Sequence, residues 1–201
     1  MKTDVITVSS KGARMEIALQ QAEKVAEYKG LSKKNAMHLR LLTEEMMGLM
    51  RSITGEAEGK FWIEDTDNNY ELHLQTVTRM TSEKREQLLS TATSGKNESA
   101  KGLMGRLRDF FDRGADEDIS GYTSPLLLHG MYESSSTSTL DWEWSMARCE
   151  EVLAPYVKKE DREALEAWDE LEKSVVAKVA DDVKVSIRGR VVEMTILKKM
   201  A

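Results

Sequence analysis

The sequence predicts a single α/β domain, a two-layer sandwich in which helices pack on one face of a mixed, mainly antiparallel sheet of about five strands. Five short β-type runs are set among long segments in which apolar residues recur at helical spacing. The chain has 201 residues, of which 40% are hydrophobic and only two are prolines, so it can close one sizeable core around long helices. We therefore expect one domain over residues 1–201.

The N-terminal part predicts a strand followed by two helices. Residues Val5–Val8 form a short β-type run, and apolar residues recur at helical spacing from Lys11 to Tyr28. Gly30 can adopt the left-handed conformation that ends a helix, and Ser32 is a suitable N-cap for the next one. The expected buried stripe of this second helix consists of Leu39, Leu42, Met46, Met50 and Ile53.

A β-hairpin is expected after the second helix. Gly59 marks a break, and Phe61–Ile63 and Tyr70–Val77 then have β-type patterns joined by a polar segment. Apolar residues alternate with polar ones in the second run, as in an antiparallel strand that is buried on one face. Short helices are predicted next, around residues 82–89 and 103–111.

Residues 114–180 predict an insertion that consists of a loop plus two helices. The helices are expected over Leu140–Leu153 and Lys159–Ala180, separated by Pro155. The apolar stripe of the second helix is formed by Leu165, Trp168, Leu171, Val175 and Val179.

A second hairpin is predicted near the C-terminus. Val183–Ile187 and Val191–Leu197 are alternating β-type runs, and Gly189 lies at the tight turn between them. We expect this hairpin to lie in the same sheet as Tyr70–Val77.

Composition restricts the partners and the compartment. The net charge is -6, and lysines and arginines are interleaved with acidic residues, so we do not expect nucleic acid as a partner. Cys149 is the only cysteine, so no intrachain disulfide can form. Residues 1–10 lack the apolar core of a signal peptide, and no run is long enough to span a bilayer. We therefore expect a cytoplasmic protein without membrane attachment.

Two motif-like stretches lack residues that their chemistry requires. Gly95-Lys96 is similar to part of a phosphate loop, but Asn97 stands where a hydroxyl residue must bind magnesium. Asp65, Asp67 and Asn69 match the first ligand positions of a calcium loop, but the glycine and the bidentate glutamate of such a loop are missing. Turn chemistry explains these polar residues better, and the three histidines have no ligand partners at metal spacing. The sequence predicts no metal site.

The order strand, helix, helix, hairpin, irregular segment, helix and terminal hairpin resembles the GHKL superfamily, the ATP-binding domain of histidine kinases and anti-sigma-factor kinases. The stretch Leu41–Arg51, with sequence LLTEEMMGLMR, is similar to the first conserved helix of that family. The resemblance implies that Glu44 occupies the position of the catalytic glutamate, which acts as or orients the base. Gly48 occupies the position of the asparagine that holds magnesium one helical turn later.

The other two motifs of the family are matched only in part. The resemblance places Gln75 where the family has an aspartate that accepts a hydrogen bond from the adenine amino group. Gly102, Leu103 and Gly105 match the glycine-rich start of the helix behind the phosphates, where free amides can receive an anion. ATP with Mg²⁺ is therefore the cofactor that the resemblance implies, although a ligand for the metal and one for adenine are replaced.

Two functions follow from this comparison. In the first, the protein is a bacterial regulatory protein that keeps the ATP-binding scaffold in degenerate form, as a pseudo-ATPase, and acts through protein–protein contact, with a homodimer as one possibility. In the second, it is an active ATPase or a serine/threonine kinase of the anti-sigma-factor type. Phosphoryl transfer depends on positioned metal and charge, so the loss of several site elements favours the first.

The insertion is the expected contact surface, and three of the four tryptophans lie in it. Trp168 belongs to a regular stripe, so we assign it to packing. Trp142 and Trp144 are two apart on a predicted helix and are not expected to share one narrow face, so one of them is the candidate contact residue. We expect residues 114–157 to replace the nucleotide lid as the functional surface.

Overall fold

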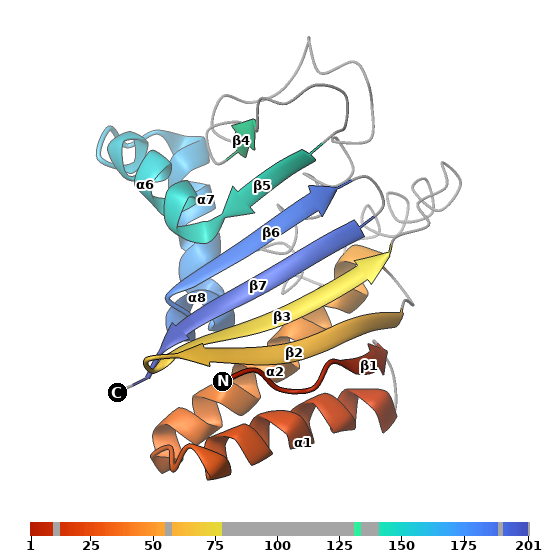
Figure 1. Cartoon of the computed structure of the whole chain (residues 1–201). Coiled ribbons are helices and arrows are strands. Elements are labelled where there is room, and N and C mark those ends of the chain that lie inside the picture. The colour runs from red at the N-terminus through yellow and green to blue at the C-terminus, as the bar shows by residue number, and fades with distance from the viewer. Residues whose placement is uncertain (10–12, 55–57, 78–130, 134–140, 189–190, 201) are drawn as a thin grey trace.

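The computed structural model describes residues 1–9, 13–54, 58–77, 131–133, 141–188 and 191–200 (Figure 1). Its first elements are β1 (Ile6–Ser9), α1 (Ala13–Tyr28), α2 (Lys33–Thr54), β2 (Glu58–Thr66) and β3 (Asn69–Val77). The later ones are β4 (Met131–Glu133), β5 (Asp141–Ser145), α6 (Met146–Val157), α7 (Arg162–Lys173), α8 (Val175–Val179), β6 (Asp182–Arg188) and β7 (Val191–Lys199). The helices predicted around residues 82–89 and 103–111 lie outside the described residues.

The described strands form one seven-stranded sheet in the order β1-β2-β3-β7-β6-β5-β4 (Figure 1). Each neighbouring pair is antiparallel. The ladder between β3 and β7 runs from Asn69 opposite Lys199 to Val77 opposite Val191, so the two predicted hairpins share one sheet. The predicted α/β class with a mainly antiparallel sheet is confirmed. The five predicted β-type runs all lie in this sheet as β1, β2, β3, β6 and β7, and β4 and β5, which were not predicted as strands, extend it beyond β6.

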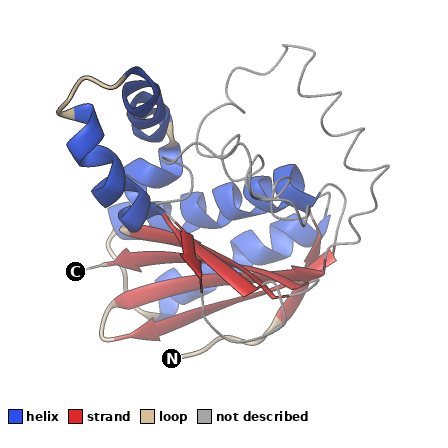
Figure 2. Ribbon diagram, turned by 90° about the horizontal axis from the view of Figure 1, so that it is seen from above, coloured by secondary structure: helices blue, strands red, loops and turns tan. Residues whose placement is uncertain are grey.

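The hydrophobic core lies between α2 and one face of the sheet, and Figure 2 shows the described helices on that side. Leu39, Leu42 and Met46 of α2 are fully buried, as predicted. Alternate residues of the central strands face them, since side chains of a strand point to opposite sides in turn. The buried strand residues are Phe61, Ile63, Tyr70, Leu72, Leu74, Val183, Val185, Val192, Met194 and Ile196.

The connection between α1 and α2 follows the predicted capping chemistry. Gly30 has a φ of 60°, the left-handed conformation that favours glycine, and its N–H donates to the carbonyl oxygen of Glu27 at 3.0 Å. The Ser32 hydroxyl then accepts a hydrogen bond from the N–H of Asn35 at 3.2 Å. These two residues turn the chain so that α1 packs beside α2 and β1.

The turn of the first hairpin is shorter than predicted. Asp65 pairs with Tyr70 and Thr66 with Asn69, so only Asp67 and Asn68 connect the strands. Both have positive φ, 52° and 66°, as a tight two-residue hairpin turn requires. The side-chain amide of Asn69 donates to the carbonyl oxygen of Thr66 at 3.0 Å. Turn geometry therefore accounts for the acidic and amide residues of this segment, as the sequence predicts.

Gly59 lies within β2, where the sequence predicts a break. It pairs with Thr76, and a Cβ at this position would be 3.0 Å from the carbonyl oxygen of Gln75 and 3.2 Å from the Leu74 side chain. Glycine is needed here because the neighbouring strand approaches closely.

The predicted helix over Leu140–Leu153 is wrong in its first part. Asp141–Ser145 is strand β5, paired with β6, and α6 begins only at Met146. The sequence Asp-Trp-Glu-Trp-Ser alternates with period two and contains tryptophan, which is favoured in strands. Trp142 and Trp144 therefore lie opposite Ile187 and Val185 in a ladder and not on a helix. Pro155, predicted to separate two helices, lies inside α6.

The single helix predicted over Lys159–Ala180 is divided into α7 and α8. Ser174 separates them, and its hydroxyl accepts a hydrogen bond from the N–H of Ala177 at 3.4 Å as the N-cap of α8. The chain therefore changes direction, and the apolar stripe predicted for one long helix is not buried as a whole. Leu165 and Val175, which belong to that stripe, are each 43% exposed, whereas Val176 is buried.

Within the described residues, none of the helices combines the length with the apolar character that crossing a bilayer requires.

Candidate functional site

Two of the residues that the family resemblance implies, Glu44 and Gly48, lie on the outer side of α2. Both are exposed, whereas Thr43, Met46 and Met47 beside them are buried against the sheet. The spacing of four residues places Glu44 and Gly48 on one face of the helix, as predicted. Gly48 brings no oxygen atom to this face, so Glu44 has no metal-ligating side chain beside it at the implied position.

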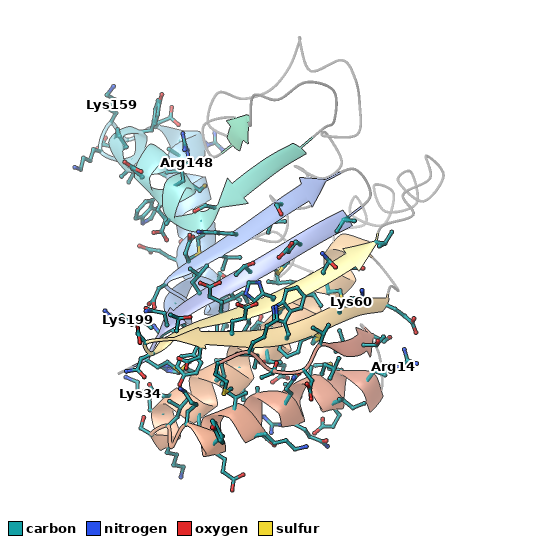
Figure 3. All side chains as sticks on the ribbon, viewed as in Figure 1. Arg14, Lys34, Lys60, Arg148, Lys159 and Lys199 are labelled. Atoms are coloured by element: carbon teal, nitrogen blue, oxygen red, sulfur yellow. The ribbon has the colours of Figure 1, made fainter. Side chains whose placement is uncertain are left out.

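Gln75 lies on the other side of the sheet. Its neighbours along β3, Leu74 and Thr76, are buried on the side of α2, so the side chain of Gln75 points to the opposite face. In the ladders it pairs with Lys60, labelled in Figure 3, and with Glu193. The structure therefore does not bring Gln75 together with Glu44.

The remaining residues implied by the resemblance, Gly102, Leu103 and Gly105, lie outside the described residues. Their relation to Glu44 stays a prediction.

Glu45, which the sequence comparison did not single out, is a second carboxylate on α2. It is half-buried, and burial together with the neighbouring charge of Glu44 raises its pKa above the ordinary value. The adjacent acidic pair in the sequence is the signal that could have drawn attention to it.

The face of the sheet opposite the helices, which we call the open sheet face, carries a pair of stacked aromatic rings. Trp62 of β2 stacks on His73 of β3, with ring centroids 4.8 Å apart and an angle of 5° between the planes. The two residues are directly opposite in the ladder, so the register of the hairpin explains their contact. Figure 2 draws no described helix over this face.

Polar groups on three strands surround this aromatic pair. The indole N–H of Trp62 donates to Glu64 at 2.8 Å, and Lys2 forms an ion pair with the same carboxylate at 2.9 Å. Hydrogen bonding from Lys2 and then from Trp62 lowers the pKa of Glu64. A Glu71 oxygen lies 3.3 Å from Nε2 of His73, and the Thr195 hydroxyl lies 3.2 Å from Nδ1. The side chains around the aromatic pair are therefore held by one another.

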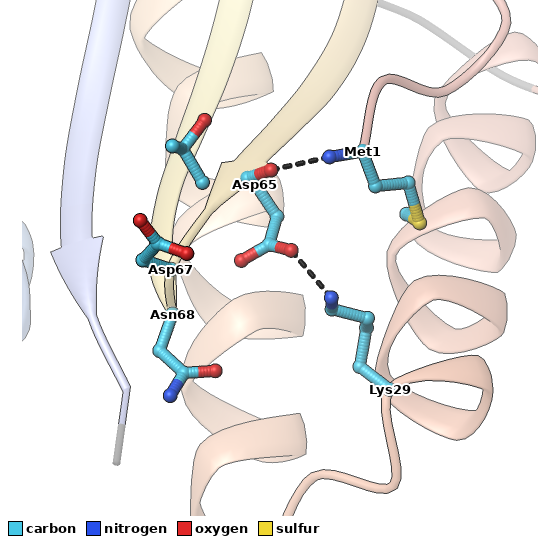
Figure 4. A pocket seen from close by; sticks show the side chains of 6 residues that line it. Met1, Lys29, Asp65, Asp67 and Asn68 are labelled. Atoms are coloured by element: carbon cyan, nitrogen blue, oxygen red, sulfur yellow. Dashed lines mark hydrogen bonds and ion pairs between the residues drawn. The ribbon is translucent and has the colours of Figure 1, made fainter.

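A polar pocket opens at the turn end of the first hairpin (Figure 4). Its lining residues are Met1, Lys29, Asp65, Thr66, Asp67 and Asn68, and its volume is ≈ 570 Å³. Asp65 is only 3% exposed and forms an ion pair with Lys29 at 2.5 Å, while its carbonyl oxygen accepts a hydrogen bond from the Met1 amino group. Lys29 thus neutralises the buried carboxylate, and we assign this cluster to stability.

A smaller pocket of ≈ 310 Å³ lies among the three C-terminal helices. Glu150 of α6, Trp168 and Glu172 of α7, and Ala177 and Lys178 of α8 line it. The indole N–H of Trp168 donates to Glu172 at 2.9 Å, one helical turn away, and the ring packs partly against the core, as its predicted packing role requires. We call this the indole pocket.

Among the described residues, no group of three or more histidine, cysteine or acidic side chains could hold a metal ion. Comparisons with models of protein families, with curated proteins and with solved structures find no significant match to this chain. The surfaces described above therefore have to be interpreted from their own chemistry. Together they offer hydrogen-bonding, charged and aromatic groups.

The exposed position of Gly48 allows a direct test of the environment of α2. Outside its own turn of α2, no described residue would come within 4 Å of a Cβ at Gly48, so we expect Gly48→Ala to raise the free energy of unfolding by about 0.5–1 kcal/mol, the usual gain when alanine replaces an interior helical glycine. Urea unfolding followed by circular dichroism measures it. Gly59→Ala is the matched control and should destabilise, because its Cβ would crowd the Gln75 carbonyl group. A loss of stability in Gly48→Ala would mean that this side of α2 is covered.

Proposed function

We propose that this protein is a bacterial cytoplasmic regulatory protein that acts through contact with another protein. In this proposal its scaffold is a degenerate form of the histidine-kinase-like ATP-binding fold, a two-layer sandwich that no longer supports ATP turnover. The order β1, α1, α2 and β2-β3 hairpin, with a terminal β6-β7 hairpin in the same sheet, supports the fold assignment. A homodimer is one form that the contact can take.

One observation carries the functional part of the proposal: Glu44 and Gln75 lie on opposite sides of the sheet. In the family, the catalytic glutamate and the adenine-binding residue must reach the same nucleotide. Their separation, together with the absence of an oxygen ligand at Gly48, argues against a complete ATP site. Regulation by contact does not require either residue.

The open sheet face is the surface that we assign to this contact. Tryptophan is enriched among residues that dominate binding energy, and Trp62 lies on this face with its ring already held by Glu64 and His73. A side chain that is fixed before binding loses less conformational freedom in the complex. Residues 114–157, with Trp142 and Trp144, remain the second candidate surface, and β5 places these two tryptophans in the same sheet.

Nucleotide binding tests the proposal first. We expect the protein to show no Mg²⁺-dependent gain in ATP affinity and no ATP hydrolysis, because Gly48 supplies no metal ligand. Isothermal titration with and without Mg²⁺ measures the affinity, and phosphate release measures the turnover. Gly48→Asn, which restores an amide oxygen at this position, should not create activity, because Gln75 stays on the other face. Magnesium-dependent turnover that disappears in Glu44→Ala would restore the active ATPase or kinase alternative.

Partner capture tests the positive claim. The tagged protein should retain a partner from bacterial cytoplasm, and Trp62→Ala should weaken this retention about tenfold or more, in line with the loss of a central interface tryptophan. Lys60→Ala, next to Trp62 on the same face but outside the aromatic stack, is the control. Equal retention by wild type and Trp62→Ala would exclude the open sheet face, and Trp142→Ala and Trp144→Ala would then test the second surface.

A further inference from the structure

The indole pocket has a composition that matches a positively charged organic group. Trp168 and Glu172 come from α7 and Glu150 from α6, so one aromatic ring and two carboxylates converge from two helices. Cations are attracted both to the face of an indole ring and to carboxylates, and the two attractions combine in sites that hold ammonium groups. This composition separates the pocket from the many surface glutamates of the chain.

The tryptophan ring is fixed in this pocket. Its N–H donates to Glu172 at 2.9 Å, and the ring packs partly against the core. This hydrogen bond is made at the edge of the ring, whereas a cation is attracted to the face. Glu172 itself is exposed, and its carboxylate can accept further hydrogen bonds while it holds the indole.

Glu150 adds an electrostatic reason for a bound cation. This carboxylate is half-buried, and burial, followed by the nearby charge of Asp182, raises its pKa above the ordinary value. Lys178 of α8 is the cationic side chain among the described residues that line the pocket. A cation that enters the pocket would stabilise the charged form of Glu150, which the surroundings disfavour.

We propose that the indole pocket binds the ammonium or guanidinium group of a lysine or arginine side chain on the partner protein. This inference rests on the proposed function, because it names the part of the partner that the protein recognises. The net charge of -6 would attract a basic partner over longer range, and the pocket would then fix the register of the complex. The same chemistry would also admit a free alkylammonium or alkylguanidinium compound.

Small cations test the pocket without the partner. Butylammonium and butylguanidinium are titrated into ¹⁵N-labelled protein, and the indole N–H resonance of Trp168 is followed after assignment by its loss in Trp168→Phe. A saturable shift is expected with both cations and none with the neutral analogue butanol. Glu150→Gln and Glu172→Gln should each weaken the binding about five- to tenfold. Glu151→Gln is the matched control for Glu150→Gln, because Glu151 is exposed on the same helix, α6, and does not line the pocket.

The pH dependence gives an independent readout. Because the charged form of Glu150 binds the cation, affinity should rise as pH increases through the raised pKa of this group, and the rise should be absent in Glu150→Gln. Absence of a saturable Trp168 shift, or equal shifts with butanol, would overturn the proposal. So would equal binding by wild type and both glutamine variants.

Partner capture separates this inference from the proposed function. If Glu172→Gln and Glu150→Gln bind cations weakly but retain the partner as well as wild type, the pocket does not serve that contact and the inference about the partner is wrong. If no partner is retained by any form while the cations still bind to wild type, the proposed function fails and the cation site stands alone as a site for free cations.

Discussion

Replacement of Asp182 by alanine is expected to lower the free energy of unfolding by about 2–3 kcal/mol, because its carboxylate links the strands β5 and β6 to the start of α6. Asp182 accepts hydrogen bonds from the Ser145 hydroxyl at 3.1 Å, from the N–H of Ala147 at 3.0 Å and from its neighbour Val183 at 2.8 Å. The N–H of Ala147 belongs to the first turn of α6, where a negative charge is also favoured by the helix dipole.

Urea unfolding measures this loss, and two variants define its origin. Asp182→Asn keeps an acceptor oxygen but removes the charge, so it should lose less stability than Asp182→Ala. Ser145→Ala removes one donor to the carboxylate and the N-cap of α6, whose hydroxyl accepts from the N–H of Arg148 at 3.4 Å. If Asp182→Ala stays within about 0.5 kcal/mol of wild type, as ordinary surface substitutions do, the carboxylate does not hold α6 against the sheet.

Replacement of Lys29 by methionine is expected to lower the melting temperature by about 5–10 °C, because it leaves the buried carboxylate of Asp65 without its cationic partner. The hydrogen bond to Asp65 raises the pKa of Lys29 above its ordinary value of 10.5, although burial acts in the opposite direction. In the wild type this contribution is therefore complete below pH 10.5 and is lost only as pH rises through the raised pKa.

The pH dependence of the variant follows from Lys29 itself. The difference in melting temperature between Lys29→Met and wild type should shrink as pH rises through the raised pKa of Lys29, because the wild type then loses the same charge. The double variant Lys29→Met/Asp65→Asn removes both charges and should recover part of the lost stability. Calorimetry over a range of pH measures both effects, and a pH-independent deficit that the double variant does not reduce would show that the loss is one of packing.

Most of the sheet and the first two helices could be predicted because their patterns are local. The stripe along α2, the cap at Ser32 and the alternation along β3 each depend on residues a few positions apart. The β5 segment was misassigned because it has only five residues and runs directly into α6, so the apolar residues of strand and helix merge into one apparent period. The break at Ser174 was missed since serine is tolerated inside helices as well as at their N-caps.

The candidate sites were less predictable, because they depend on which elements meet in space. The Trp62–His73 stack could have been found from the hairpin alone, once Asp67 and Asn68 are placed at the turn and the register is counted back. The Trp168–Glu172 contact also follows from helical spacing. The convergence of Glu150 with these residues could not be predicted from the sequence, since it requires the packing of α6 on α7. Likewise, only the sheet itself shows that Gln75 and Glu44 point away from each other.

The position of β7 has a consequence for how the protein is made. This strand follows all other described strands in the sequence, yet in the sheet it lies between β3 and β6 and pairs with both. While the ribosome is still synthesising β7, the strands on either side of it have no partner at that edge, and their unpaired backbone groups can associate with other chains. Contacts between residues as distant as Leu72 and Ile196 also make closure of the sheet slow, because a long loop must be ordered first. The nascent chain should therefore depend on chaperones until β7 has emerged from the ribosome.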